Sequence, residues 1–170
     1  KRVGCPANRK HRSRLRVVEL MVELLGGADI RALADSLGVV PTKKLGQNFV
    51  TDPNTIRKIV SSAKLEPSEI VVEIGPGLGS LTLGLLEAVD HVISVEIDSK
   101  MAAAIEETVG KRAVGRKFSL VTEDAMKVTE LPEPPTALVA NLPYNISVPV
   151  LLHFIETFPS IRHGLVLVQT

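Results

Sequence analysis

The sequence has no tryptophan and few aromatic residues of any kind: aromatic side chains make up 3% of its 170 residues, with one tyrosine and four phenylalanines. The core therefore has to be built from aliphatic side chains, as is typical of the parallel sheets of α/β proteins. Hydrophobic residues make up 45% of the chain, which is enough for one packed domain.

Cysteine is also scarce. The single Cys5 has no partner for an internal disulfide, and with only His11 near it in the sequence it falls short of the ligand set of a zinc site. We therefore expect no metal, and a reducing, cytoplasmic setting is the simplest interpretation.

No stretch of the N-terminal part is apolar over the length of a membrane span. The run Leu15–Leu25 is interrupted by three charged residues and predicts an amphipathic helix that ends at Gly26-Gly27. A second short helical pattern begins at Asp29 and ends at Gly38. We expect a helical leader here and no membrane partner.

Positive charge is concentrated at the start of the chain, although the net charge is only +1. Seven of the 20 Lys and Arg residues lie within residues 1–16, which contain none of the 19 acidic residues. Such a basic arm contacts nucleic acid in some proteins, is a solvated tail in others, and resembles the Arg-rich start of a transit peptide. The arm alone leaves these interpretations open.

The stretch that organises the rest of the chain is Val71–Thr82, an apolar β-branched run followed by glycines and then by helical spacing. A strand, a glycine turn and a helix in this order are typical of nucleotide-type cofactor sites, although glycines also serve ordinary tight turns. The spacing Gly-x-Gly-x-Gly fits a pyrophosphate-binding fingerprint imperfectly. Glu73 places a carboxylate at the strand's end, which suits a cofactor without a diphosphate.

Strand and helix patterns alternate along most of the remaining sequence. Strands are predicted at 70–74, 91–96, 118–122, 136–140 and 164–169, and helices begin at Asp52-Pro53, after the glycines and at Asp98. This alternation predicts an α/β fold with a parallel sheet.

Polar residues follow several of these strands, on the side where open α/β sheets bind ligands. Glu96 stands about 20 residues after the first glycine, where a ribose-binding carboxylate belongs. Asp124 can accept a hydrogen bond from an adenine-type amine, and turn formation explains it equally well. In Asn141-Leu142-Pro143-Tyr144, Pro143 stiffens a turn and leaves carbonyl groups free, and Tyr144 offers a stacking face, which suits a planar base with an amino group.

Taken together, these segments resemble the KsgA-type ribosomal RNA adenine dimethyltransferases, which use S-adenosyl-L-methionine and are related to the Erm methyltransferases. The resemblance covers about residues 41–170. Five motifs stand in the family's order: Leu45-Gly46-Gln47-Asn48-Phe49, Glu73-Ile74-Gly75-Pro76-Gly77-Leu78-Gly79, Val95-Glu96-Ile97-Asp98, Asp124-Ala125 and Asn141-Leu142-Pro143-Tyr144-Asn145. The resemblance implies a class I, Rossmann-like methyltransferase sheet and the N6,N6-dimethylation of two adjacent adenosines in a small-subunit rRNA hairpin during ribosome biogenesis.

The resemblance also implies roles for single residues. Glu96 binds the ribose hydroxyls, Asp124 recognises the adenine of the cofactor, and Asn141 lies between cofactor and substrate. The implied cofactor-binding residues are Gln47, Asn48, Val50, Gly75, Gly77, Glu96, Ile97, Asp124, Ala125 and Asn141. The implied catalytic residues, which also form the pocket of the target base, are Asn141, Leu142, Pro143 and Tyr144.

Members of this family continue beyond the strand at 164–169 into further strands and a small helical domain. The charge and helix patterns predict a basic arm and helical leader over residues 1–40. The resemblance implies a methyltransferase domain over 41–170 without those C-terminal parts. The expected partner is small-subunit rRNA in an immature small ribosomal subunit, bound by a monomer.

Two other functions remain as alternatives. One is a non-catalytic RNA-binding factor of ribosome assembly with the same fold. The other is a nucleotide-dependent oxidoreductase, against which the imperfect glycine spacing and the segment Asn141–Tyr144 both speak.

Overall fold

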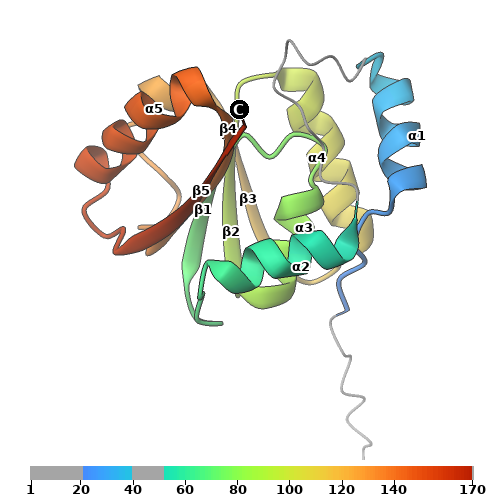
Figure 1. Cartoon of the computed structure of the whole chain (residues 1–170), viewed down its shortest axis with the longest axis horizontal. Helices are drawn as coiled ribbons and strands as arrows, with labels where there is room; N and C mark the ends of the chain where they lie inside the picture. Colours follow the sequence, from blue (N-terminus) through green and yellow to red (C-terminus); the bar gives the residue numbers. More distant parts are fainter. Residues whose placement is uncertain (1–20, 40–51, 170) are drawn as a thin grey trace, which may run out of the picture.

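A computed structural model describes residues 21–39 and 52–169 of the chain. Figure 1 shows the path of the chain. Its elements are α1 (Gly27–Leu37), α2 (Pro53–Ser62), β1 (Ile70–Ile74), α3 (Ser80–Ala88), β2 (His91–Glu96), α4 (Ser99–Arg112), β3 (Lys117–Thr122), the 3₁₀ turn η2 (Ala125–Lys127), β4 (Ala137–Pro143), α5 (Tyr144–Thr157) and β5 (His163–Gln169). The predicted alternation of strands and helices is confirmed.

All five strands are parallel and lie in the order β3-β2-β1-β4-β5. The chain starts in the middle of the sheet at β1, moves outward to β3 and then crosses back to place β4 on the other side of β1. In open α/β sheets, ligands bind at the carboxyl ends of the strands where the strand order reverses in this way. The reversal places the glycine loop after β1 beside the end of β4.

Helices cover both faces of the sheet, with α5 on one face and α2, α3 and α4 on the other (Figure 1). Because successive strand residues point to opposite faces, each inner strand contributes side chains to the hydrophobic cores on both faces of the sheet. Val71 and Val139 belong to the core under α3 and α4, whereas Val72 and Leu138 pack with Phe154 of α5. This double burial explains why the inner strands have continuous apolar sequences.

The predicted helix Leu15–Leu25 is wrong in its described part, because residues 21–26 have no regular secondary structure. The backbone N–H of Glu23 donates to the carbonyl of Arg112 at 2.8 Å, and Arg112 donates from its guanidinium to the Leu24 carbonyl at 3.3 Å. Leu25 is buried beside them. This segment therefore bonds to the end of α4 instead of forming its own helical turns, and residues 15–20 lie outside the described residues.

The second predicted helix of the leader is confirmed as α1, which begins at Gly27 and ends before Gly38 in the left-handed conformation. The Asp29 carboxylate accepts a hydrogen bond from the Gly26 N–H at 2.9 Å and forms an ion pair with Arg112. Ile30 and Ala34 belong to the same buried cluster as the side chains of α3 and α4. The described part of the leader thus packs onto the sheet domain.

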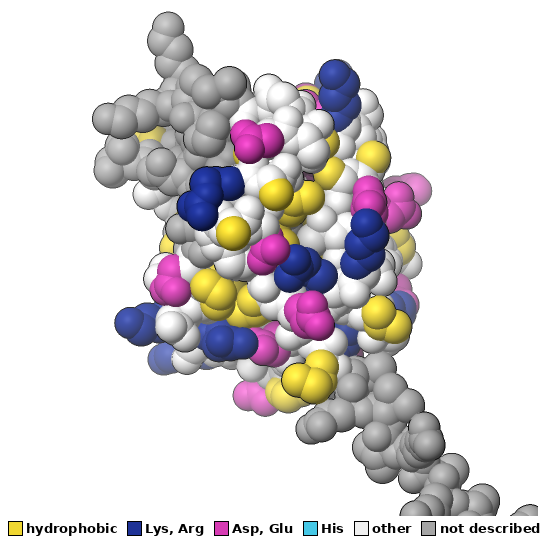
Figure 2. Space-filling model, turned by 90° about the vertical axis from the view of Figure 1, so that its right-hand side faces the viewer, with side chains coloured by type: hydrophobic (Ala, Val, Ile, Leu, Met, Phe, Trp, Pro, Cys, Tyr) yellow, Lys and Arg dark blue, Asp and Glu magenta, His cyan; other side chains and the backbone are white. Residues whose placement is uncertain are grey.

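The face formed by α1 and α4 carries acidic and basic side chains side by side (Figure 2). The contacts between Arg112 and Asp29 and between Lys111 and Glu107 are two of its ion pairs. None of the described helices combines the length and apolar character that a membrane crossing requires.

The predicted helix starts at Asp52 and Asp98 are confirmed. Asp52 accepts a hydrogen bond from the Thr55 N–H at 2.9 Å, and Asp98 accepts from the N–H groups of Lys100 and Met101 at 2.8 and 3.1 Å. Each cap satisfies N–H groups that the helix itself leaves unpaired, and such a cap stabilises a helix by about 1 kcal/mol.

The fourth strand is longer than predicted. It continues past Ala140 to Pro143, and Asn141 lies opposite Leu167 of β5. Pro143 thus ends a strand and does not stand in a separate turn, and α5, which the sequence analysis did not predict, begins at the next residue. The apolar spacing of α5 is helical, but Pro149 inside it is a residue that normally interrupts helices.

Candidate cofactor pocket

A pocket of about 330 Å³ opens where β1, β2, β3 and β4 end, beside the glycine loop. This volume lies at the small end of the range of ligand pockets, which begins at about 300 Å³. Nine of the residues predicted for cofactor or substrate line it together: Gly75, Gly77, Glu96, Ile97, Asp124, Ala125, Asn141, Leu142 and Pro143. Sequence segments that are up to 68 positions apart therefore meet at one edge of the sheet.

The glycine loop passes close to the end of β4. Gly75 and Gly77 have φ angles of +71° and +57°, a region that residues with a Cβ atom rarely adopt. A Cβ atom at Gly75 would also lie 3.3 Å from the Leu142 side chain. The glycines thus let the loop run along the wall of the pocket and leave its backbone accessible to a ligand.

Glu96 ends β2 and is 9% exposed. Its Oε1 accepts a hydrogen bond from the Asp98 N–H at 3.0 Å. Burial raises the pKa of Glu96, and hydrogen bonds from the backbone of Asp98 and Gly77 act against this rise. The result is a fixed carboxylate in the wall of the pocket, placed to accept hydrogen bonds from hydroxyl groups.

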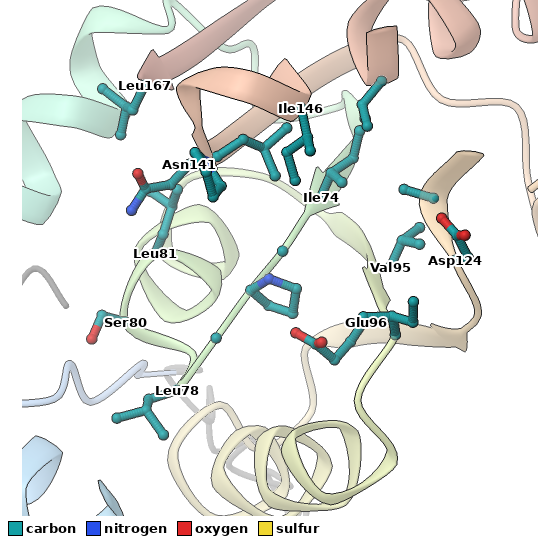
Figure 3. Close-up of a pocket in the computed structure, with 18 of the residues that line it drawn as sticks. Ile74, Leu78, Ser80, Leu81, Val95, Glu96, Asp124, Asn141, Ile146 and Leu167 are labelled. Atoms are coloured by element: carbon teal, nitrogen blue, oxygen red, sulfur yellow. The ribbon is translucent and has the colours of Figure 1, made fainter. Parts of the chain in front are cut away.

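Asp124 has the turn role that the sequence left open and also lies in the pocket. Its Oδ1 accepts a hydrogen bond from the Met126 N–H at 3.0 Å, which starts η2. In Figure 3, Glu96 and Asp124 lie on one side of the glycine loop, and Asn141 lies on the other side. The pocket thus has carboxylates at one end and an amide at the other.

The end near Asn141 is also lined by apolar side chains that the sequence analysis missed. In Figure 3, Leu81, Ile146 and Leu167 lie on the same side of the glycine loop as Asn141, and Ile56 and Ile59 of α2 line the same pocket. Aliphatic residues of this kind cannot be told apart from core residues by sequence pattern. The available sequence signals were the positions of Leu81 directly after the glycine loop and of Ile146 shortly after Pro143.

Some predicted site residues do not lie in this pocket. Tyr144 does not line it, because it starts α5 on the surface and is 72% exposed. Gln47, Asn48 and Val50 lie outside the described residues, so their predicted cofactor contacts stay predictions.

Glu73 was expected to present its carboxylate to the ligand, and this expectation is wrong. It is 1% exposed and does not line the pocket, because strand side chains alternate and Ile74 takes the position that faces the ligand. Its Oε2 accepts hydrogen bonds from the hydroxyls of Thr82 at 2.6 Å and Ser94 at 2.7 Å. Burial raises the pKa of Glu73 to about 7.

Within residues 21–39 and 52–169 there is no group of three or more side chains that could hold a metal ion. The pocket is also lined by no histidine, cysteine or lysine among these residues. The polar side chains of the described lining are the carboxylates of Glu96, Glu123 and Asp124, the amide of Asn141 and the hydroxyl of Ser80.

Solved structures of methyltransferases share this fold. The 23S rRNA methyltransferase ErmE superposes with a TM-score of 0.62 at 32% sequence identity, over 72% of this chain and 48% of that one. A dimethyladenosine transferase from Plasmodium falciparum superposes with a TM-score of 0.60 at 32% identity, over 70% of this chain and 42% of that one. The protein has the Rossmann-like α/β fold of class I methyltransferases, as the sequence predicted.

Sequence comparison defines the family. The family model described as "Ribosomal RNA adenine dimethylase" matches residues 41–170. Two proteins named "Ribosomal RNA small subunit methyltransferase A" are close relatives: that of Streptomyces griseus is 63% identical over 150 residues, which cover 86% of this chain and 52% of the relative, and that of Paenarthrobacter aurescens is 61% identical over 148 residues, which cover 86% and 50%. The chain belongs to the ribosomal RNA adenine dimethylase family. It spans about half the length of the curated relatives that it matches.

Proposed function

We propose that this chain binds S-adenosyl-L-methionine and transfers its methyl group to N6 of two adjacent adenosines in a small-subunit rRNA hairpin, giving N6,N6-dimethyladenosine. The observation that carries this proposal is that the glycine loop, Glu96, Asp124 and Asn141 line the same pocket. Membership of the ribosomal RNA adenine dimethylase family supports the substrate class. A monomer acting on an immature small subunit in the cytoplasm is part of the same proposal.

The residues of the pocket fit this cofactor. Glu96 offers a fixed acceptor for the two ribose hydroxyls, Asp124 and Ala125 lie where the adenine would be bound, and Ile97 adds an apolar contact beside them. The glycine loop gives the rest of the cofactor a backbone surface to lie on. When bound, S-adenosyl-L-methionine supplies an electrophilic methyl group on a sulfonium sulfur.

The residues at the end of β4 would hold the acceptor base. N6 of adenine is a weak nucleophile because its lone pair is delocalised into the ring. Carbonyl acceptors from Asn141 and from the backbone at Leu142 and Pro143 would orient the amino group and stabilise the positive charge that develops on it. Tyr144, exposed beside Pro143, would stack on the extruded base at the mouth of the site.

A direct transfer suits this pocket better than a covalent intermediate. No histidine, cysteine or lysine lies in the described lining to suggest a covalent intermediate. We therefore propose in-line transfer, in which the protein contributes position and electrostatic stabilisation.

Two measurements test the proposal. Calorimetry of the full 170-residue chain with S-adenosyl-L-methionine is expected to show one binding site, and incubation with immature small-subunit particles is expected to transfer methyl groups to adenosine N6. Absence of cofactor binding would overturn the proposal. Cofactor binding without transfer would indicate a chain that holds the cofactor but does not dock its rRNA substrate.

A further inference from the structure

One wall of the pocket belongs to α2, which packs directly against α3 (Figure 1). Ile56 and Ile59 of α2 line the pocket together with the glycine loop, and α3 continues directly from that loop. Ile56 is only 2% exposed, so it is fixed by packing. The separation of α2 and α3 therefore sets the distance between the isoleucine wall and the loop.

At the crossing of the two helices, α3 carries Gly84. A Cβ atom at this position would lie 2.3 Å from Cγ2 of Ile56 and 3.2 Å from Cγ2 of Val60. The first distance is too short for a pair of non-bonded carbon atoms, which make contact at about 3.5–4.0 Å. The present spacing of the helices thus requires a residue without a side chain at position 84.

The neighbours of Gly84 cannot easily move aside. Both Ile56 and Val60 are β-branched, and the χ1 angle of such side chains is nearly fixed in a helix. Their Cγ2 atoms therefore cannot rotate away. Both side chains are also buried, which leaves little room for another rotamer. A methyl group at position 84 would therefore displace the whole of α2.

We propose that Gly84 is a positioning residue of the cofactor pocket: it lets α2 approach α3 closely enough for Ile56 to line the same pocket as the glycine loop. The glycine itself is buried in the helix contact and does not line the pocket. The nature of the ligand in this inference rests on the proposed function, but the helix spacing does not.

The chain contains a matched control for the test. Gly110 also lies inside a helix, α4, and a Cβ atom there would meet nothing within 4 Å. Gly84→Ala and Gly110→Ala introduce the same methyl group and the same gain in helix propensity. Only the first changes a helix contact.

Calorimetry with S-adenosyl-L-methionine on the whole chain measures the effect. We expect Gly84→Ala to weaken binding about tenfold, the scale of an overpacked contact, and Gly110→Ala to stay within about twofold. Ile56→Leu removes the colliding Cγ2 atom, so Gly84→Ala combined with Ile56→Leu is expected to bind as Ile56→Leu does alone. Should Gly84→Ala not fold, this double variant decides the question: a double variant that binds like Ile56→Leu supports the proposal, and one that does not overturns it.

A lower melting temperature of Gly84→Ala with unchanged affinity would show a purely structural role and overturn the proposal. A crystal structure of Gly84→Ala gives a readout without ligand, in which α2 is expected to lie about 1 Å farther from α3, the shift that restores normal contact. An unmoved α2 would also overturn the proposal. If the unaltered chain binds no S-adenosyl-L-methionine, the proposed function fails, and the position of α2 still decides the role of Gly84.

Discussion

The Thr82 hydroxyl donates a hydrogen bond of 2.6 Å to the Glu73 carboxylate inside the protein, and the Ser94 hydroxyl donates to the same oxygen at 2.7 Å. Together these bonds join α3 and β2 to the end of β1, just before the glycine loop. The other oxygen, Oε1, is buried and has no hydrogen-bond partner among the described residues. The Glu73 carboxylate thus holds together the elements on either side of the glycine loop through one of its two oxygens. Because it is buried, the stability of the fold depends on its protonation state.

The first prediction concerns pH. Because burial raises the pKa of Glu73 to about 7 from an unfolded value of 4.5, the folded protein binds a proton between these pH values that the unfolded chain does not bind. The free energy of unfolding should therefore fall as the pH rises through this window, by up to about 3 kcal/mol. Urea denaturation from pH 5 to pH 8 measures this fall.

The variant Glu73→Gln cannot lose a proton, so its free energy of unfolding should change less over the same pH range. Glu130→Gln, at an exposed position, serves as the control and should keep the pH dependence of the unaltered protein. Equal pH dependence in Glu73→Gln and the unaltered protein would contradict the assignment.

The second prediction concerns Glu96. Replacing it with Gln removes the negative charge of the acceptor while keeping its shape, and hydrogen bonds to charged groups are the stronger ones. We expect cofactor affinity to fall about 10- to 100-fold in calorimetry.

The raised pKa of Glu96 also affects the unaltered protein. On acidification, its cofactor affinity should begin to fall at a higher pH than it would if Glu96 had the usual pKa of a glutamate. Glu106→Gln, on the exposed side of α4, is expected to bind normally; equal loss in both variants would refute the role of Glu96.

The third prediction separates binding from transfer. Asn141 lies at the end of the pocket away from Glu96 and Asp124. Asn141→Ala should therefore keep its affinity for S-adenosyl-L-methionine but lose about 100-fold in methyl transfer, the scale of one lost electrostatic contact to a transition state. The readout is methyl incorporation into immature small-subunit particles, with Asn54→Ala on the exposed side of α2 as control. Unchanged turnover of Asn141→Ala would exclude the proposed role.

Strand positions were predictable because short β-branched runs bounded by turn residues leave few alternatives. The predicted bounds of β1 and β2 agree with the structure, and the residues at strand ends converge as expected, because parallel strands share one carboxyl edge. The face of the sheet to which the Glu73 side chain points was not predictable. In a strand with apolar neighbours on both faces, alternation does not tell which face meets the ligand.

Other features depend on contacts between distant residues. Residues 21–25 have helical composition, but Arg112 provides a backbone partner and a side-chain donor that hold them out of a helix. Tyr144 follows three pocket residues in sequence, yet the start of α5 turns it to the surface. Neither result follows from local pattern.

The last prediction concerns Glu69, which holds together the edge of the sheet opposite the pocket. Its Oε1 accepts hydrogen bonds from His163 at 2.8 Å and Thr136 at 3.2 Å, and its Oε2 accepts from the Glu66 N–H at 2.9 Å. Burial alone would raise the pKa of Glu69, but the Glu66 N–H and His163 outweigh it and hold the pKa below its usual value.

A lowered pKa in the folded state means stability that is present above the unfolded pKa and is lost as the pH falls through the folded one. Glu69→Gln should therefore cost about 1–3 kcal/mol at pH 7 in urea denaturation, and this difference from the unaltered protein should shrink at pH 3.5, where the carboxyl of the unaltered protein is increasingly protonated. Glu66→Gln keeps the backbone donor and should change little at either pH, whereas a cost of Glu69→Gln that is the same at both pH values would show that charge plays no part in this network.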